Sequence, residues 1–247
     1  MNDSTIQALR GELTSLAQRR GLLAEQVAVR IKPLSVKQAI GTPERDDFPL
    51  QKGKERIIEA SFKGGVGQAF TDAFRDFESD VAGLLALDLT DPFNAAAFVA
   101  AANAIAAHLG LARQTIHCRD KEPTLCAPKL VEYLRRRHPG ARRVTLVGLQ
   151  PAMAAALAPH YELAILDMDP DNIGRTVAGA TVGHGGRDLE RLAAWADVLA
   201  ATGSTLANNS IEAVRAAAGP RPVIFFGVTI AGAAELLGLE RFCPLGH

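Results

Sequence analysis

The sequence has few of the features that stabilise secreted or membrane proteins. Three cysteines among 247 residues, Cys118, Cys126 and Cys243, cannot form a disulfide framework, and a sparse, odd number is typical of a reducing compartment. The longest apolar run, residues 95–109, is interrupted by an asparagine and a histidine and is shorter than a membrane span of roughly 18 apolar residues. The N-terminal residues lack the basic start and apolar stretch of a signal peptide. We therefore expect a cytoplasmic protein that does not enter the membrane.

The chain also lacks an excess of positive or negative charge. The chain has 27 Lys and Arg residues and 27 Asp and Glu residues, so its formal net charge is zero. This balance argues against a strongly basic nucleic-acid binder and against an acidic disordered protein. Aromatic residues make up only 5% of the chain while 48% is apolar, so the core must consist mainly of alanine and aliphatic side chains.

The first half of the chain predicts a sheet followed by helices, an α+β pattern. Helical spacing of apolar residues indicates helices, and alternation of apolar and polar residues indicates half-buried strands. The expected elements, in chain order, are a helix from Ser4, strands at 26–32, 35–42 and 56–62, and helices at 78–87 and 95–109.

The second half has a different rhythm, in which short apolar strands alternate with helices. Continuously apolar strands are expected where helices cover both faces of a parallel sheet. The expected strands are 144–147, 163–166, 198–201 and 222–226, and the expected helices are 124–138, 151–159, 187–196, 209–218 and 231–237. Four strand–helix units predict a small, doubly wound α/β domain. We place the first domain at residues 1–115 and the second at 116–247.

Ligands of such a sheet bind beyond the carboxyl ends of its strands, so the loops there are the candidate sites. The loop after the first strand contains Gly148 but lacks the other glycines of a dinucleotide fingerprint. A tight turn is the simpler interpretation of this loop. Asp167 ends the second strand, nineteen residues after Gly148 (167 − 148), where related folds hold a ribose hydroxyl. Asp169 and Asp171 suit a solvated loop better than a cation site, because the other ligands of a calcium loop are missing.

The most specific segment, residues 202–210, follows the third strand and reads T-G-S-T-L-A-N-N-S. Asn209 and Glu212 have the spacing of a capping box, but this alone does not explain the other hydroxyl and amide side chains. Such groups suit an uncharged polar ligand or an anion. Thr229, after the last strand, is expected beside this segment or as a simple helix cap.

The cysteines and histidines do not have the spacing of a zinc site. His117 and Cys118 are adjacent, Cys126 follows eight residues later, and Cys243 and His247 lie near the end of the sequence. We interpret the cysteines as buried thiols and the histidines as surface imidazoles.

The order of these segments resembles the DUF364 family of heavy-metal chelation domains. The family pattern T-G-x-T-L-x-N-x-T falls on 202–210, with serine at the last position, and V-G-x-x-P falls on 147–151. The G-P-S-x-P pattern is only partly kept at 227–231, where both prolines are missing. Residues 63–70 and 101–104 resemble the two signatures of the DUF4213 domain that precedes DUF364 in this family. The resemblance implies an enolase N-terminal-like α+β domain, a Rossmann-like α/β domain and a site in the cleft between them.

We therefore expect the cleft to bind a small polar molecule or a metal chelate, with a transition metal held mainly by oxygen and nitrogen atoms. The expected ligand-binding residues of the second half are Gly148, Gln150, Asp167, Thr202, Gly203, Ser204, Thr205, Asn208, Gly227 and Thr229. From the first half, Asn103 and Lys63 are expected to close the cleft. Two alternatives stay open: a transferase or lyase for a nucleoside-like metabolite, and an interaction module whose cleft is filled by side chains. Base rates favour a homodimer.

Overall fold

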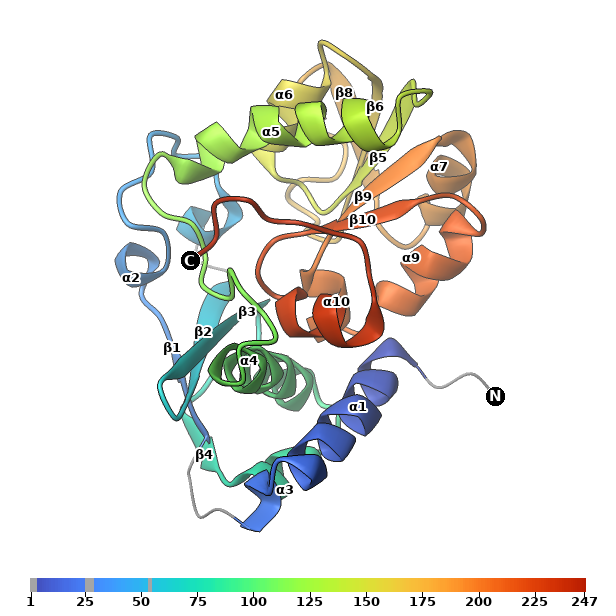
Figure 1. Ribbon diagram of the computed structural model, residues 1–247. Helices are drawn as coiled ribbons and strands as arrows, with labels where there is room; N and C mark the ends of the chain where they lie inside the picture. Colours follow the sequence, from blue (N-terminus) through green and yellow to red (C-terminus); the bar gives the residue numbers. More distant parts are fainter. Residues whose placement is uncertain (1–3, 25–28, 53–54) are drawn as a thin grey trace.

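The computed structural model describes residues 4–24, 29–52 and 55–247, which form a mixed α/β structure with two sheets (Figure 1). The sheet of the first half has the order β3-β2-β1-β4, and its strands pair antiparallel. Its strands are β1 (Val29–Pro33), β2 (Arg56–Phe62), β3 (Gly65–Thr71) and β4 (Phe77–Ser79). The predicted strand at 56–62 is confirmed. Of the strand predicted at 26–32, residues 26–28 lie outside the described part of the chain.

Two predictions in the first half are wrong, and both errors concern helix caps. The helices are α1 (Thr5–Arg19), α2 (Val36–Ile40), α3 (Val81–Leu85) and α4 (Pro92–His108), with short 3-10 turns η1 (Leu22–Ala24) and η2 (Pro49–Lys52). The segment predicted as a strand at 35–42 is α2, because Ser35 and Gln38 form a capping box. The helix predicted at 78–87 is β4 followed by α3, which Asp80 caps at the Gly83 amide.

Helix α4 is the centre of the first half. Its residues 95–106 are all buried, as expected for a helix that is apolar all round. Strand β3 crosses α4 at very close range through two glycines. A Cβ atom on Gly67 would lie 2.3 Å from the Ala104 amide nitrogen, and one on Gly65 would lie 2.3 Å from the Ala104 carbonyl oxygen. The glycine-rich sequence after β2 therefore serves helix–strand packing.

The second sheet has the order β11-β10-β9-β5-β6-β8-β7, and all of its pairs are parallel except β7–β8. Its strands are β5 (Arg143–Val147), β6 (Glu162–Asp167), β7 (Thr176–Val177), β8 (Ala180–His184), β9 (Val198–Thr202), β10 (Val223–Phe226) and β11 (Arg241–Phe242). The four predicted strands are confirmed within one residue at each end. Strands β7, β8 and β11 were not predicted from the sequence.

Helices cover both faces of this sheet (Figure 1). They are α5 (Glu122–Arg137), α6 (Pro151–Leu157), α7 (Leu189–Trp195), α8 (Ser204–Ala207), α9 (Ile211–Ala218) and α10 (Ala231–Leu237). Side chains of α5 and α6 pack with Leu146 and Ile165 on one face, whereas α7 and α9 pack with Leu166 and Leu199 on the other. The predicted capping box at the start of α9 does not form: Asn209 bonds the Leu89 carbonyl oxygen instead.

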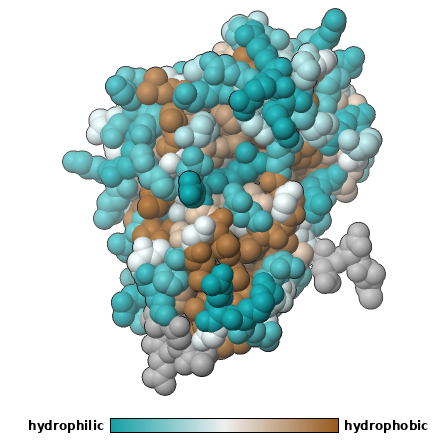
Figure 2. Space-filling view, in the orientation of Figure 1, coloured by the Kyte–Doolittle hydropathy of each residue, from teal (hydrophilic) through white to brown (hydrophobic). Residues whose placement is uncertain are grey.

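The two halves share one apolar core. A continuous cluster of buried side chains extends from α1, α4 and the first sheet to α8, α9, α10 and one face of the second sheet. Figure 2 shows apolar side chains gathered on the lower half of one face, around α4 and the helices beside it. Among the described residues, no helix has both the length and the apolar character needed to cross a bilayer.

We predict that Gly67→Ala strongly destabilises the protein. The added methyl group would overlap the α4 backbone, and overpacking of this kind costs about 1–3 kcal/mol or more. The free energy of unfolding from urea titrations measures the effect.

Gly11→Ala is the matched control, because Gly11 is an exposed residue of α1 where an added methyl group would have no atom within 4 Å to meet. Alanine at an exposed helix position is expected to raise stability by up to about 1 kcal/mol. Equal effects of the two substitutions would contradict the packing described here.

Candidate functional site

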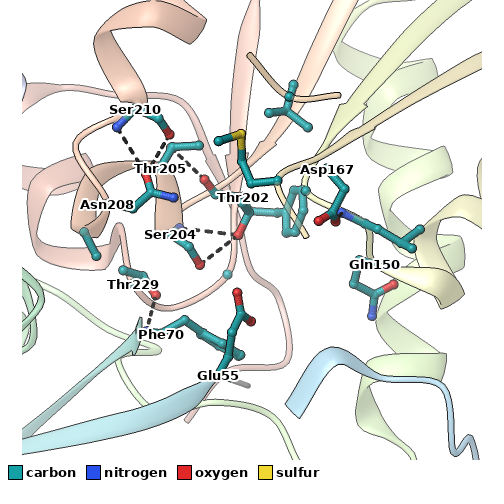
Figure 3. A pocket seen from close by; sticks show the side chains of 18 of the residues that line it. Glu55, Phe70, Gln150, Asp167, Thr202, Ser204, Thr205, Asn208, Ser210 and Thr229 are labelled. Carbon is teal, nitrogen blue, oxygen red and sulfur yellow. Dashed lines mark hydrogen bonds between the residues drawn. The ribbon is translucent and has the colours of Figure 1, made fainter. Parts of the chain in front are cut away.

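A cavity of about 970 Å³ lies between the two halves of the chain. Loops at the carboxyl ends of β5, β6, β9 and β10 form one wall, and the end of β3 with the loop before β2 forms the opposite wall (Figure 3). Nine of the predicted ligand-binding residues line it. They are Gly148, Gln150, Asp167, Thr202, Ser204, Thr205, Asn208, Gly227 and Thr229. The fold therefore brings together loops that are far apart in the sequence.

The cavity is located where the strand order of the second sheet reverses. From β5 the chain adds β6 and β8 on one side, and it then returns to add β9 and β10 on the other side. The switch point is therefore between β5 and β9. Gly148 ends β5 with φ +87°, a conformation that favours glycine, and a Cβ there would lie 2.6 Å from Thr202 Cγ2. Gly148 thus lets the ends of the two strands approach each other at this switch point.

Residues 202–210, which we call the hydroxyl turn, face the cavity from the end of β9. The Thr202 and Ser204 hydroxyl groups lie 3.2 Å apart, and Thr205 Oγ1 donates to the Thr202 carbonyl oxygen at 2.8 Å. Asn208 Oδ1 accepts hydrogen bonds from the Ser210 amide and hydroxyl groups. These bonds hold the turn in place while the Ser204 hydroxyl and the Asn208 side-chain NH2 group remain suited to bind a ligand.

The amides around the switch point are already bound by nearby side chains. Leu149 N donates to Asp167 Oδ2 at 2.7 Å, Met153 N donates to Gln150 Oε1 at 2.6 Å, and Ser204 N donates to Thr202 Oγ1 at 3.3 Å. Folds that bind phosphate at a switch point use such amides for the anion. Here the chain's own oxygen atoms occupy three of them, which does not favour phosphate binding at these amides.

The Asp167 carboxylate accepts backbone amides of two loops. Its second oxygen, Oδ1, accepts the Asp169 amide at 2.7 Å, and the Gly185 amide donates to its backbone carbonyl oxygen. Asp169 Oδ1 in turn accepts the Asp171 amide. The carboxylate therefore holds the ends of β5 and β6 together, which does not favour the role of a ribose-binding residue.

Three of the predicted residues do not line the cavity. Asn103 is 1% exposed, and its amide bonds only the protein's own backbone. Gly203 donates its amide to the Phe226 carbonyl oxygen and contacts Ile230. Lys63 lies in the β2–β3 turn, at the opposite end of β3 from the cavity wall. Asn103 and Lys63 therefore do not close the cavity from the first half as expected, and Gly203 is engaged in backbone packing behind the cavity wall.

Asn103 instead joins the two halves. Its Nδ2 donates to the carbonyl oxygens of Gln68 in β3 and of Val228 and Thr229 after β10, at 3.0–3.1 Å. Its Oδ1 accepts the Gly232 amide of α10 at 2.7 Å. Thr229 adds a second link, because its Oγ1 accepts the Phe70 amide at 3.1 Å. The Thr229 hydroxyl group thus joins the two walls of the cavity.

Glu55 is the site residue that the sequence analysis missed. It lines the cavity just before β2, and its carboxyl group points toward the hydroxyl turn (Figure 3). No hydrogen bond or ion pair joins this side chain to another residue that the structure describes. Burial, together with the negative charges of Asp167, Asp72 and Asp169, raises the pKa of Glu55 to about 7. No motif marks this glutamate, because it lies in a charged segment that could equally be a surface loop.

The three cysteines are also brought together, although 125 residues separate Cys118 from Cys243 (243 − 118). All three are free thiols that line the cavity. Burial raises the pKa of each, to about 12 for Cys126, and the neighbouring thiols raise that of Cys118 further. The prediction of buried thiols is confirmed for Cys126, whereas Cys118 and Cys243 are half-buried.

His117, beside this thiol group, is not a surface imidazole. Its ring packs edge-on against Phe70, and burial lowers its pKa to about 4. Its Nδ1 is buried without a hydrogen-bond partner among the described residues. His247, in contrast, is exposed, and its Nε2 lies 2.9 Å from the Glu122 carboxylate. Within the described part of the chain, no three His, Cys, Asp or Glu residues are arranged to hold a metal ion.

Comparison with known proteins supports part of the resemblance. The sequence profile of DUF364, described as "Putative heavy-metal chelation", matches residues 131–239. No curated protein matches the chain. A DUF364-family protein of unknown function from Pyrococcus horikoshii is similar over 90% of this chain and 79% of its own, with a TM-score of 0.51 and 13% identity. A second, from Desulfitobacterium hafniense, covers 74% of this chain and 72% of its own, with a TM-score of 0.48 and 16% identity. The first similarity shows a common fold.

We predict that the stability of the protein depends on the titration of Glu55. Because its pKa is raised, the folded chain holds a proton between about pH 4.5 and 7 that the unfolded chain releases. Stability due to this group is therefore lost as the pH rises through that window. As the pH rises from 5 to 8, the free energy of unfolding of Glu55→Gln should increase by on the order of 2 kcal/mol relative to that of the native protein. Urea unfolding at both pH values measures the difference, and Glu132→Gln on the exposed side of α5 is the control. Parallel pH profiles of native protein and Glu55→Gln would contradict the prediction.

We also predict that the three thiols react slowly in the folded protein. Their raised pKa values leave almost no thiolate at pH 8, and the thiolate is the reactive form. Iodoacetamide labelling followed by mass spectrometry should show slow modification in buffer and rapid modification of all three in 6 M guanidinium chloride. Rapid labelling of the folded chain would show that the thiols are accessible and ionised.

Proposed function

We propose that the chain binds a small molecule or a metal chelate in the cavity between its two halves and takes part in the handling of heavy metals. The observation that carries this proposal is the cavity itself. Its volume of about 970 Å³ is at the upper end of the range of about 300–1,000 Å³ typical of ligand sites. It opens at the switch point of a parallel sheet, where such folds bind their ligands.

The arrangement of the side chains favours a chelate over a bare ion. The described residues provide no preformed group of three metal ligands, and the space exceeds what an ion needs. An organic chelator would supply its own oxygen or nitrogen ligands and fill the cavity. Ser204 and Asn208 would then bind the chelator by hydrogen bonds, and the apolar wall, which includes Phe48 and Leu50, would pack against it.

The proposal includes a finer description of the fold. We infer that the second sheet and its helices form the Rossmann-like domain, and that the first sheet with α4 forms the enolase N-terminal-like DUF4213 domain. The reversal of strand order at β5 supports the first assignment. The antiparallel sheet followed by α3 and α4 supports the second. On this interpretation the cavity is the interdomain cleft.

The alternative, a transferase or lyase for a nucleoside-like metabolite, has less support. It depended on Asp167 as a ribose-binding residue, but both carboxylate oxygens of Asp167 accept backbone amides. Three amides at the switch point that could bind a phosphate are also engaged by the chain's own side chains. Chelate binding is therefore the function that the geometry favours.

We predict that metal chelates raise the melting temperature of the protein and that free aquo ions raise it less. Thermal-shift titrations with Ni²⁺, Co²⁺, Fe³⁺ and Zn²⁺, each alone and with citrate or ethylenediamine, test this, because a ligand that binds the folded state stabilises it. The substitution Ser204→Phe should abolish the shift by filling the cavity. Ser61→Phe, on the exposed side of β2, is the control for added aromatic bulk.

Two results would contradict the chelate proposal. In the first, no chelate changes the melting temperature. In the second, adenosine or S-adenosylmethionine gives a shift that Asp167→Ala removes, which would favour the enzyme alternative.

A further inference from the structure

The charge of the cavity wall is one-sided. Five carboxylic acids line it, and no lysine or arginine of the described residues does. These acids are Glu55, Asp72, Asp167, Asp169 and Glu190. The whole chain has equal numbers of acidic and basic residues, so this separation is a property of the cavity and not of the composition. Inside a partly buried cavity, solvent and salt screen such charges less than at an open surface.

Glu55 has a special position among these acids. Asp167 and Asp169 accept backbone amides and so connect segments of their own loops. Glu55 comes from the opposite wall, points into the cavity and has no partner among the described residues (Figure 3). Burial, and after it the negative charges of Asp167, Asp72 and Asp169, disfavour the ionised form of Glu55. A positive charge placed between the two walls would remove this repulsion.

Three backbone amides that could attract an anion already donate hydrogen bonds to the protein itself. The amides of Leu149, Met153 and Ser204 are bound by the chain's own oxygen atoms, as described above. An anion in the cavity would meet several carboxylates, and the described residues that line the cavity include no lysine or arginine to compensate them. This argues against the anionic ligand that the hydroxyl turn suggests when its sequence is considered alone.

We propose that the ligand of the cavity is a cation with N–H donors and that Glu55 is its counter-ion. The proposal rests on the proposed function, in which this cavity is the binding site. The carboxylates of Glu55 and Asp167 face the space from opposite walls. Thr202 and Ser204 line the same space, and their hydroxyl oxygen atoms can accept hydrogen bonds from a ligand. A metal–ammine complex, whose charge comes from the metal ion, and a protonated amine both combine positive charge with N–H groups that these oxygen atoms can bind. Such a ligand is either a cationic metal–amine complex or a free organic polyamine.

Three probes of equal charge magnitude separate these sources. Hexaamminecobalt(III) and spermidine carry three positive charges, and tris(oxalato)cobaltate(III) carries three negative charges. The two cobalt complexes exchange their ligands slowly, so they test charge without metal transfer. Binding is measured by equilibrium dialysis for cobalt and by calorimetry for spermidine, at pH 8 and 150 mM salt, where exposed charges are screened. The full chain is used as native protein, Glu55→Gln and the control Glu132→Gln.

We expect the hexaammine complex or spermidine to bind one site per chain, and the oxalato complex not to bind. Binding of the cobalt cation alone identifies a metal–amine ligand, binding of spermidine alone identifies an organic amine, and binding of both shows that charge and N–H donors suffice. Glu55→Gln should weaken cation binding by about tenfold or more, because it removes a charge next to the ligand without changing the shape of the side chain. Glu132→Gln should not change it.

Other outcomes overturn the proposal, and they do so independently of the proposed function. If the oxalato complex binds and both cations do not, the cavity is a chelate site for anions and only this inference fails. If none of the three binds, the cation inference fails, and the thermal-shift titrations with chelates decide the proposed function separately. If a cation binds equally well to native protein and to Glu55→Gln, while circular dichroism shows both folded, Glu55 is not the counter-ion.

Discussion

The hydrogen bonds of one buried amide, Asn103, hold the two halves of the structure in register. Its NH2 group bonds carbonyl oxygens of β3 and of the loop after β10, while its carbonyl oxygen accepts an amide of α10. A buried amide without these partners would cost free energy, so the loop after β10 is held where it meets them. This loop carries Thr229, and Thr229 in turn bonds the Phe70 amide on the cavity wall. The shape of the cavity thus depends on a residue that does not line it.

The chemistry of the cavity follows from how the loops of the second sheet satisfy their own backbone. In a parallel sheet the loops at the switch point have free amides, and these normally favour anions. Here Asp167, Gln150 and Thr202 bind the amides and hold the loops together. This arrangement places the Asp167 carboxylate at the switch point and engages three of the amide donors. The same hydrogen bonds connect the loops at the ends of β5, β6 and β9.

Sequence patterns predicted the second sheet well because its strands are continuously apolar and each ends at a turn signal. They failed where local chemistry was decisive. A capping box makes 35–42 helical, although its apolar residues could also fit a strand. Strand β8 has five residues of which only one is buried, and β11 has two residues, so neither has a clear apolar pattern. Nine of the twelve expected ligand-binding residues line the cavity, because the carboxyl ends of parallel strands must meet at one edge.

The remaining features of the site depend on contacts between distant segments, which no local pattern contains. Glu55 belongs to a charged segment that resembles a surface loop, and its environment arises only when β2 meets the loops after β6 and β9. The three thiols come from two regions of the chain more than 100 residues apart. Asn103 could be assigned to the site by its family signature alone, whereas its burial within α4 decides its actual role.

The shared core has a consequence for how a ligand enters and leaves. Many proteins with a ligand between two lobes open like jaws about a hinge, but here such a motion would break the bonds of Asn103 and expose the apolar cluster that spans both halves. A ligand of the cavity would therefore have to pass the rim without separation of the two halves. Phe48 and Leu50 of the segment 41–52 line the cavity, and Thr42 N donates to Asp120 Oδ1 at 2.8 Å, so this part of the rim is itself bonded to the loop before α5.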